Sequence, residues 1–211
     1  MKLKMGNCLV RIFGDVNHRD EWGMTALHRA ARAGDLGRCR DLVTRGADME
    51  IRDNGGETAV MCAAREGHLE TVKYITEAGA DMEIRDNGGW TAVMWAAVRG
   101  HLETVKYLTE ARADIEIRDN VGRTVVMWAA QYKHYKVCQH LIYSGADLST
   151  AKKYLDDLLA WAAKEGDLNM YLQLVRAGAK PFNIEVAARK KHYKVCQHLI
   201  HSGVDLSTAK K

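Results

Sequence analysis

The residues best suited to chemistry are two histidines and a cysteine that occur together twice in the second half of the chain. The two sets are His134, Cys138 and His140, and His192, Cys196 and His198. Residues four apart share one face of a helix, so His134 and Cys138 could both ligate zinc. However, His134 aligns with earlier histidines of a repeated pattern, and Cys138 aligns with valines. We therefore favour buried core residues over a zinc site and predict no metal.

Other patterns that support catalysis or cofactor binding are missing from the sequence. It contains no glycine-rich phosphate loop before a helix, no His-Glu-x-x-His and no Cys-x-x-Cys. Asp53-Asn54-Gly55 resembles a fragment of a calcium loop, but the alternating acidic ligands and the closing glutamate are missing. Turn formation explains this tripeptide better, because Asp and Asn side chains accept backbone hydrogen bonds and glycine accepts positive φ. We predict no catalytic residue, no cofactor and no enzymatic activity.

These residues lie in a sequence that repeats every 33 residues. Threonine recurs at Thr25, Thr58, Thr91 and Thr124, and a pair of alanines follows each threonine at a constant distance. A fixed period of this length indicates stacked supersecondary units rather than one closed core.

The residue pattern of each regular unit predicts a turn followed by two short helices. Asp-x-x-Gly makes the turn, the threonine begins an alanine-rich first helix as its N-cap, and a glycine such as Gly67 ends that helix. A second helix places Leu69, Val72 and Ile75 on one face. Gly79 then supplies a left-handed C-cap. Arg112 occupies the same position one unit later, where we expect a strained positive φ.

The pattern resembles the ankyrin repeat. The Thr-Pro-Leu-His-x-Ala motif of that family appears as Thr25-Ala26-Leu27-His28-Arg29-Ala30, and weaker versions begin at Thr58, Thr91 and Thr124. No copy keeps the proline, and only the first keeps the histidine. The resemblance covers nearly the whole chain and implies an all-α ankyrin-repeat solenoid, in which each repeat is a β-turn followed by two antiparallel helices. We expect about five to six repeats, with degenerate terminal units.

On this alignment the chain divides into seven segments. Residues 1–19 form a degenerate N-terminal cap or partial repeat, and regular repeats follow at residues 20–52, 53–85, 86–118 and 119–151. Residues 152–184 form a degenerate repeat that lacks Asp-x-x-Gly, and we expect a longer first helix in place of its turn. Residues 185–211 form a shortened capping repeat. Atypical end units are expected because their outer faces meet water.

Composition narrows the class of protein and its compartment. The 211 residues are 47% hydrophobic and include one proline, which suits a helical array. No apolar run is long enough to span a membrane, and the first residues lack the apolar stretch of a secretory signal. Cys39, Cys138 and Cys196 stand where other repeats carry valine, which indicates buried hydrophobic residues in a reducing compartment. We therefore expect a cytoplasmic or nuclear protein.

The resemblance also implies a binding function. In ankyrin repeat proteins, partners contact variable positions of the turns and first helices, which form a rigid concave face. The nearly identical repeats 53–85 and 86–118 differ at such positions, where Glu57 becomes Trp90 and Arg65-Glu66 becomes Val98-Arg99. We expect a monomeric, non-enzymatic scaffold or adaptor. Its protein partner is expected to contact Trp22, Met24, Arg32, Glu57, Arg65, Glu66, Trp90, Val98, Arg99, Arg123, Gln131 and Tyr132.

The five tryptophans fall into two groups. Trp22 and Trp90 lie in turns, where nothing in the repeat itself obviously covers them, and an exposed tryptophan on a rigid turn is a typical interface anchor. The remaining three recur one repeat apart, at a position that favours packing between repeats over an aromatic binding stripe. They are Trp95, Trp128 and Trp161.

A column of charged residues has two interpretations. Arginines recur at Arg52, Arg85 and Arg118, and glutamates alternate with them at Glu50, Glu83 and Glu116. The column could be a cationic strip for an acidic partner. We favour a series of surface ion pairs, each of which contributes little to stability.

The charge distribution leaves one alternative function. Through Ala130 the chain has 18 basic and 20 acidic residues, a net charge of −2, and from Gln131 it has 13 basic and 7 acidic residues, a net charge of +6. Tyr135 and Tyr193 in the basic half could stack on bases. Anion or nucleic-acid binding by the basic C-terminal half is therefore the alternative. A charge of +6 is modest for that purpose, so we expect a protein partner rather than nucleic acid.

Overall fold

The fold consists of consecutive helix pairs joined by turns. The computed structural model describes residues 15–180 and 192–201, and within these ranges it contains helices and no strand. The helices form five consecutive pairs and one further helix, which confirms the all-α repeat architecture. The chain divides into two compact units, Met1–Val125 and Val126–Lys211, which are described separately below.

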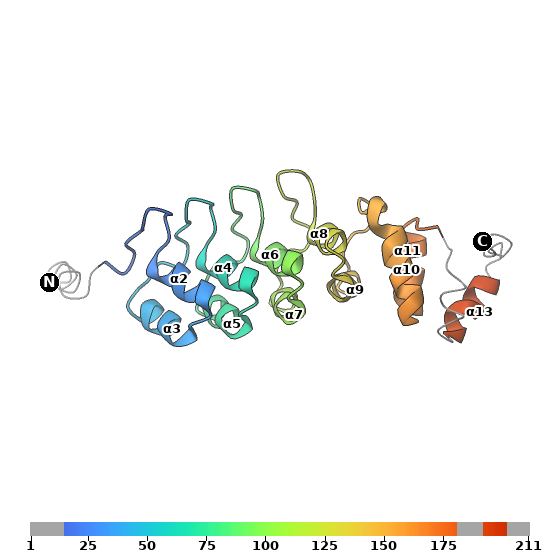
Figure 1. Ribbon diagram of the computed structural model, residues 1–211, viewed down its shortest axis with the longest axis horizontal. Coiled ribbons are helices and arrows are strands. Elements are labelled where there is room, and N and C mark those ends of the chain that lie inside the picture. Colours follow the sequence, from blue (N-terminus) through green and yellow to red (C-terminus); the bar gives the residue numbers. More distant parts are fainter. Residues whose placement is uncertain (1–14, 181–191, 202–211) are drawn as a thin grey trace. The chain divides into compact units, whose positions relative to one another are not determined.

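The first unit contains three complete helix pairs. The first helices of the repeats are α2 (Ala26–Ala33), α4 (Ala59–Glu66) and α6 (Ala92–Arg99), and the second helices are α3 (Leu36–Thr44), α5 (Leu69–Glu77) and α7 (Leu102–Glu110). Figure 1 shows the first helices side by side in one row and the second helices in another, with the turns projecting from the first row. Helix α4 contacts both α2 and α6, and α5 contacts both α3 and α7. Each repeat therefore buries its faces against its neighbours.

The core of this unit comes from small and branched apolar side chains. The alanine pairs of α2, α4 and α6 are buried, as are Val72 and Ile75 of α5. Alanine has no side chain beyond Cβ, so adjacent helices approach closely, and the branched residues fill the space between the two rows. Cys39 is fully buried, as its alignment with valine predicted, and Cys62 is fully buried as well. Cys196 in the second unit is only partly buried, so the expectation of a buried core residue is wrong there.

The turns before the first helices follow the Asp-x-x-Gly pattern. In the second repeat, Asp53 Oδ1 accepts hydrogen bonds from the backbone N–H groups of Gly55 and Glu57, both at 2.9 Å. Gly56 has φ of 83°, and a Cβ there would lie 2.6 Å from Asn87 Oδ1 of the next repeat. Glycine is therefore required twice, for the left-handed backbone and for the contact between turns. The other regular repeats form the same turn at Asp20, Asp86 and Asp119.

Polar side chains join each turn to the next one. Asn87 Nδ2 donates to Asn54 O at 2.9 Å, and Asn120 Nδ2 donates to Asn87 O at the same distance. Arg52 donates from Nη2 to Arg85 O at 2.7 Å and from Nε to Gly56 O at 3.1 Å. These bonds satisfy backbone carbonyls that project beyond the helices.

The expected ion pairs of the arginine column are therefore wrong for these residues. Arg52 and Arg85 bind carbonyl oxygens, Arg85 through Arg118 O at 2.7 Å. The glutamates also bind backbone groups, because Glu50 accepts from Asp81 N at 2.9 Å and Glu83 accepts from Asp114 N at 3.0 Å. A guanidinium that binds carbonyls of its own protein is not available as a cationic strip, so the column connects repeats instead.

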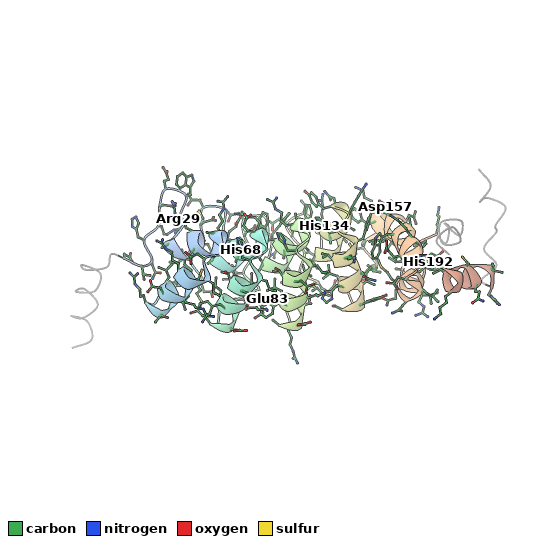
Figure 2. All side chains as sticks on the ribbon, turned by 60° about the horizontal axis from the view of Figure 1, so that its bottom comes forward. Arg29, His68, Glu83, His134, Asp157 and His192 are labelled. Carbon is green, nitrogen blue, oxygen red and sulfur yellow. The ribbon has the colours of Figure 1, made fainter. Side chains whose placement is uncertain are left out.

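A second connection joins the ends of the first helices to the following repeat. His68 Nε2 donates to Arg32 O at 3.1 Å, and His101 Nε2 donates to Arg65 O at 3.0 Å. Each imidazole lies against a glycine of the preceding repeat, and a Cβ on Gly67 would lie 2.5 Å from His101 Nδ1. Figure 2 labels His68 on the second repeat. These histidines therefore have a structural role, as expected.

The second unit continues the helix pairs with less regular sequence. It contains α8 (Val125–Gln131, which begins at the last residue of the first unit), α9 (Tyr135–Tyr143), the 3₁₀ helix η1 (Lys152–Tyr154), α10 (Leu155–Glu165), α11 (Leu168–Arg176) and α13 (Tyr193–His201). Helix α10 has 11 residues, whereas the first helices of the first unit have 8. The expected replacement of the turn by a longer first helix is therefore confirmed.

Some expectations remain untested by the structure. Residues 1–14 of the N-terminal cap, with Cys8, and the Ala187-Ala188 pair lie outside the described residues. The repeat boundaries, including residues 152–184 and 185–211, stay a prediction. Among the described helices, none has the length and hydropathy needed to cross a lipid bilayer.

Candidate functional site

A groove of about 780 Å³ crosses three repeats of the first unit. Its walls are the turns of the first two repeats and the ends of the first helices of all three. Figure 2 labels Arg29, one of its lining residues, on α2. The groove is lined by Trp22, Met24, Arg29, Arg32, Ala33, Asp53, Asn54, Gly55, Arg65, Glu66 and Arg99.

Trp22 is a large apolar side chain held open to solvent on the first turn. Its backbone N–H donates to Asp20 Oδ1 at 2.9 Å, and its carbonyl accepts from Asn54 N at 2.9 Å. The residue is 57% exposed, and Arg29 Cζ lies 5.8 Å from the ring centroid. Arg29 also forms an ion pair with Asp20. The backbone is therefore fixed and the side chain is exposed as expected, although the Arg29 guanidinium of the same repeat lies over the ring.

Arg65 forms a rigid part of the groove wall. Its Nη1 lies 2.6 and 2.7 Å from the two carboxylate oxygens of Glu57, and its Nε lies 3.3 Å from Glu66 Oε1. Its Cζ lies 5.3 Å from the ring centroid of Trp95 in the next repeat. Burial raises the pKa of Glu57, and the charge of Arg65 opposes that shift. Arg65 therefore compensates the charge of a buried carboxylate, and substitution of Arg65 alone would leave Glu57 buried without its cation.

Trp90 and Trp95 form an aromatic pair beside Arg65. Their ring centroids are 4.6 Å apart with the planes tilted by 50°, and Trp95 Nε1 donates to Asp86 Oδ2 at 3.0 Å. Trp90 is therefore half-buried, and the expectation that nothing in its own repeat covers it is wrong. The sequence shows the two tryptophans only five positions apart, but the reversal of the chain at the turn brings their rings together. Trp95 also contacts Arg65, which supports its expected place between repeats.

Arg99 is a cation of the groove that stays available for a ligand. It is the last residue of α6 and is exposed, and its side chain makes no hydrogen bond or ion pair with any described residue. Arg32, in the equivalent region of α2, lies 3.9 Å from Glu66 Oε1 through its Nε and is 57% exposed in its side chain. Glu66 thus forms ion pairs with both Arg32 and Arg65. A guanidinium without a protein partner is suited to bind an external anion.

The structure brings six of the twelve predicted contact residues to this groove. They are Trp22, Met24, Arg32, Arg65, Glu66 and Arg99. Glu57 and Val98 are buried beneath the surface, and Trp90 and Arg123 are half-buried in their turns. In the second unit, Tyr132 is exposed and stacks on Trp128 with centroids 6.2 Å apart, and Gln131 Oε1 accepts from Tyr154 Oη at 3.1 Å. Whether any of the twelve binds a partner stays a prediction.

One groove residue that the sequence reasoning missed is Arg29. It stands at the motif position that Cys62 and Trp95 occupy in later repeats, where a core residue was expected. A charged residue at an otherwise apolar repeat position was the signal that could have identified it.

The first histidine–cysteine set, at α9, lies in an environment typical of core residues. Cys138 is fully buried, and burial raises the pKa of its thiol to about 12. Zinc binds the thiolate, so this environment disfavours the ligand form. In the second set, His192 Nε2 donates to Lys164 O at 2.8 Å, which repeats the connection made by His68 and His101. The side chain of His198 lies outside the described part of the structure.

Comparison with known proteins agrees with the architecture. The profile described as ankyrin repeats (3 copies) matches residues 2–86 and 75–152, which together cover more than half of the chain. No curated protein matches the sequence.

Proposed function

Because the chain belongs to the ankyrin repeat family, we propose that it is a protein-binding module whose partner occupies the groove across the first three repeats. Proteins of this family generally bind other proteins. The partner would contact the turns and the ends of the first helices, where the chain presents its most variable side chains. The module acts by holding the partner and not by catalysis, as a monomeric scaffold or adaptor.

The observation that carries this proposal is the contrast between the wall and the ends of the groove. Arg65 is fixed by Glu57, Glu66 and Trp95, so the wall needs no ordering when a partner binds. Trp22 from the first repeat and Arg99 from the third are exposed and free to make contacts. Aromatic and arginine side chains at a preformed recess are the residues that most often dominate binding energy.

The free cysteines support an intracellular setting for this binding. Cys39, Cys62 and Cys138 are buried and unpaired. Buried thiols at equivalent core positions suit a reducing compartment. We place the module in the cytoplasm or nucleus on that ground.

The test is affinity purification of partners from the native cell with wild-type and substituted chains. We expect Trp22→Ala combined with Arg99→Glu to abolish capture of the wild-type partners without loss of folding, because both side chains are exposed. The matched control combines Val121→Ala with Arg38→Glu, since Val121 is 71% exposed on a later turn and Arg38 is exposed on α3. Retention of the same partners by the groove variant would show that the groove is not the binding site.

A further inference from the structure

The groove also indicates the chemistry of its ligand, provided that the proposed function holds. We infer that it binds an extended acidic segment of the partner protein, whose carboxylates pair with Arg99 and Arg32 while a neighbouring apolar side chain packs on Trp22. This inference rests on the charges that remain unsatisfied in the groove, on its open course over Gly55 and on the charge of the surrounding unit.

Two of the four arginines in the groove have a close carboxylate partner, and the other two do not. Arg29 is paired with Asp20, and Arg65 is paired with Glu57 at 2.6 Å. Arg32 has only a contact of 3.9 Å with Glu66, which lies closer to Arg65 at 3.3 Å, and Arg99 has no partner among the described residues. Arg32 and Arg99 therefore provide planar donor groups that match the geometry of carboxylates.

A peptide fits this charge pattern better than a nucleic acid. Asp53 and Glu66 also line the groove, and the chain through Ala130 carries 18 basic and 20 acidic residues, a net charge of −2. A strand with a phosphate on every nucleotide would meet these carboxylates as well as the arginines. A peptide can place a few carboxylates at the arginines and neutral residues beside Asp53 and Glu66.

Gly55 keeps the groove open between the first and third repeats. It occupies the turn position that carries Trp22 one repeat earlier and Val121 two repeats later, and it lines the groove. Its φ is not positive, and a Cβ there would have only Asp53 Oδ1 near it, at 3.2 Å. Because Trp22 and Val121 are accommodated at the same position, a side chain at 55 is compatible with the turn. It would project into the path of the ligand.

The first experiment selects random peptides on the wild-type chain of 211 residues. We expect the selected peptides to be enriched in Asp and Glu next to one apolar residue. A fluorescent copy of the tightest peptide should lose affinity by about tenfold or more when its acidic residues are replaced by Asn and Gln, or when the protein carries Arg99→Glu. The Arg38→Glu chain should bind as the wild type does.

A matched pair of glycine substitutions tests the path of the ligand. Gly55→Val should reduce binding of the same peptide by about tenfold or more, because the valine narrows the groove. Gly88→Val places the same side chain at the equivalent turn position outside the groove and should leave binding unchanged. Circular dichroism of both variants should show unchanged helix content, since Val121 already occupies this position in the fourth repeat.

The outcomes distinguish this inference from the proposed function. Selected peptides that are neutral or basic, yet lose binding with Trp22→Ala, would overturn the acidic ligand and leave the groove as a binding site. No enrichment relative to selection on the Gly55→Val chain would overturn the extended segment, while partner capture that depends on Trp22 and Arg99 would preserve the proposed function. Tight, Arg99-dependent binding of a single-stranded oligonucleotide in place of peptides would replace the acidic segment with a nucleic acid. Binding that ignores Trp22, Arg99 and Gly55 would contradict both.

Discussion

At the scale of single residues, two side chains in the described part of the chain occupy backbone conformations that elsewhere belong to glycine. Arg112 has φ of 69° and Lys133 has φ of 61°, whereas the equivalent C-caps and helix ends carry glycines at similar angles. The left-handed conformation brings Cβ close to the following carbonyl oxygen, which costs roughly 1–2 kcal/mol for a residue with a side chain. The strain expected at Arg112 from the repeat alignment is therefore confirmed.

Substitution of Arg112 by glycine should stabilise the protein. We expect Arg112→Gly to raise the free energy of unfolding by about 1 kcal/mol, and the melting temperature by about 2–4 °C. Thermal melts followed by circular dichroism measure the change. Arg112→Ala is the control, because it removes the guanidinium but keeps Cβ. An equal rise with alanine would show that the charge, and not the backbone, is responsible.

The loss of one motif histidine in the later repeats explains why three threonine hydroxyls are buried there without a hydrogen-bond partner among the described residues. His28 Nδ1 lies 2.9 Å from Thr25 Oγ1, and its Nε2 donates to Glu57 O at 3.0 Å. In the later repeats methionine replaces this histidine, and the hydroxyls of Thr58, Thr91 and Thr124 are buried without a hydrogen-bond partner. The expected N-cap position of the threonines is correct, but a side-chain cap bond to the helix forms at Thr25 and not at Thr58 or Thr91.

The same histidine should give the protein a component of acid sensitivity. Burial lowers the pKa of His28 from its usual 6.5. The unfolded chain then accepts a proton on this residue at a higher pH than the folded chain. The stability contributed by neutral His28 is thus fully present above pH 6.5 and is lost as the pH falls below it.

The test compares the wild type with His28→Met, which copies the residue of the next repeats. At neutral pH we expect the variant to be less stable by about 1 kcal/mol, because Thr25 loses its partner. The difference should shrink as the pH falls below 6.5, since the methionine does not titrate. Urea unfolding above and below this pH measures both chains. A difference that is constant with pH would contradict the assignment to His28.

At the scale of elements, the contact between first helices depends on a glycine and a histidine from adjacent repeats. Gly34 lies against His68, and Gly67 lies against His101, with each imidazole bonded to a carbonyl of the preceding helix. Where Lys133 replaces the glycine, the next repeat carries Asp167 in place of the histidine. Asp167 instead accepts from Gln139 Nε2 at 2.5 Å and caps α11 through Met170 N at 3.0 Å. The glycine position and the histidine position that contacts it are therefore substituted in the same pair of repeats.

Two glycine substitutions should separate backbone strain from this contact. Gly67→Ala and Gly79→Ala both place a methyl group at a positive φ, but only Gly67 has a neighbour in the way. We expect a loss of about 1 kcal/mol for Gly79→Ala and about 3 kcal/mol for Gly67→Ala, measured by urea unfolding. Adding His101→Ala to Gly67→Ala removes the obstructing ring, so the two substitutions together should cost less than the sum of their separate effects. Equal losses at both glycines would exclude a steric role for His101.

At the scale of the whole molecule, the sequence predicted what depends on local backbone chemistry. The period, the Asp-x-x-Gly turns, the left-handed Arg112 and the long α10 follow from residue types at fixed positions, and the structure contains them. The ion pair of Glu57 with Arg65 and the contact of Trp90 with Trp95 were missed. They depend on how a turn folds back over its own helix, which the pattern of apolar residues does not specify.

The sequence predicted many of the residues that line the groove, but not how their charged side chains pair. Variable turn and helix positions identified six of its eleven lining residues. Which of those arginines are neutralised could not be inferred, because each pairing depends on side-chain geometry within and between repeats. The arginine column shows the same limit, since Arg52 was expected to pair with glutamate and instead binds Arg85 O.

The uniform connections between turns have a consequence for how this gene can change. Excision of residues 53–85 would join Arg52 to Asp86 and bring Arg52 to Arg118 O, Asn87 to the first turn, and His101 to Gly34. Each new neighbour has the same chemistry as the one removed, and Arg32 would take the place of Arg65 beside Trp95. The connections between the turns and between the first helices of the regular repeats are therefore kept when this unit is removed, and the recognition surface becomes shorter by one repeat.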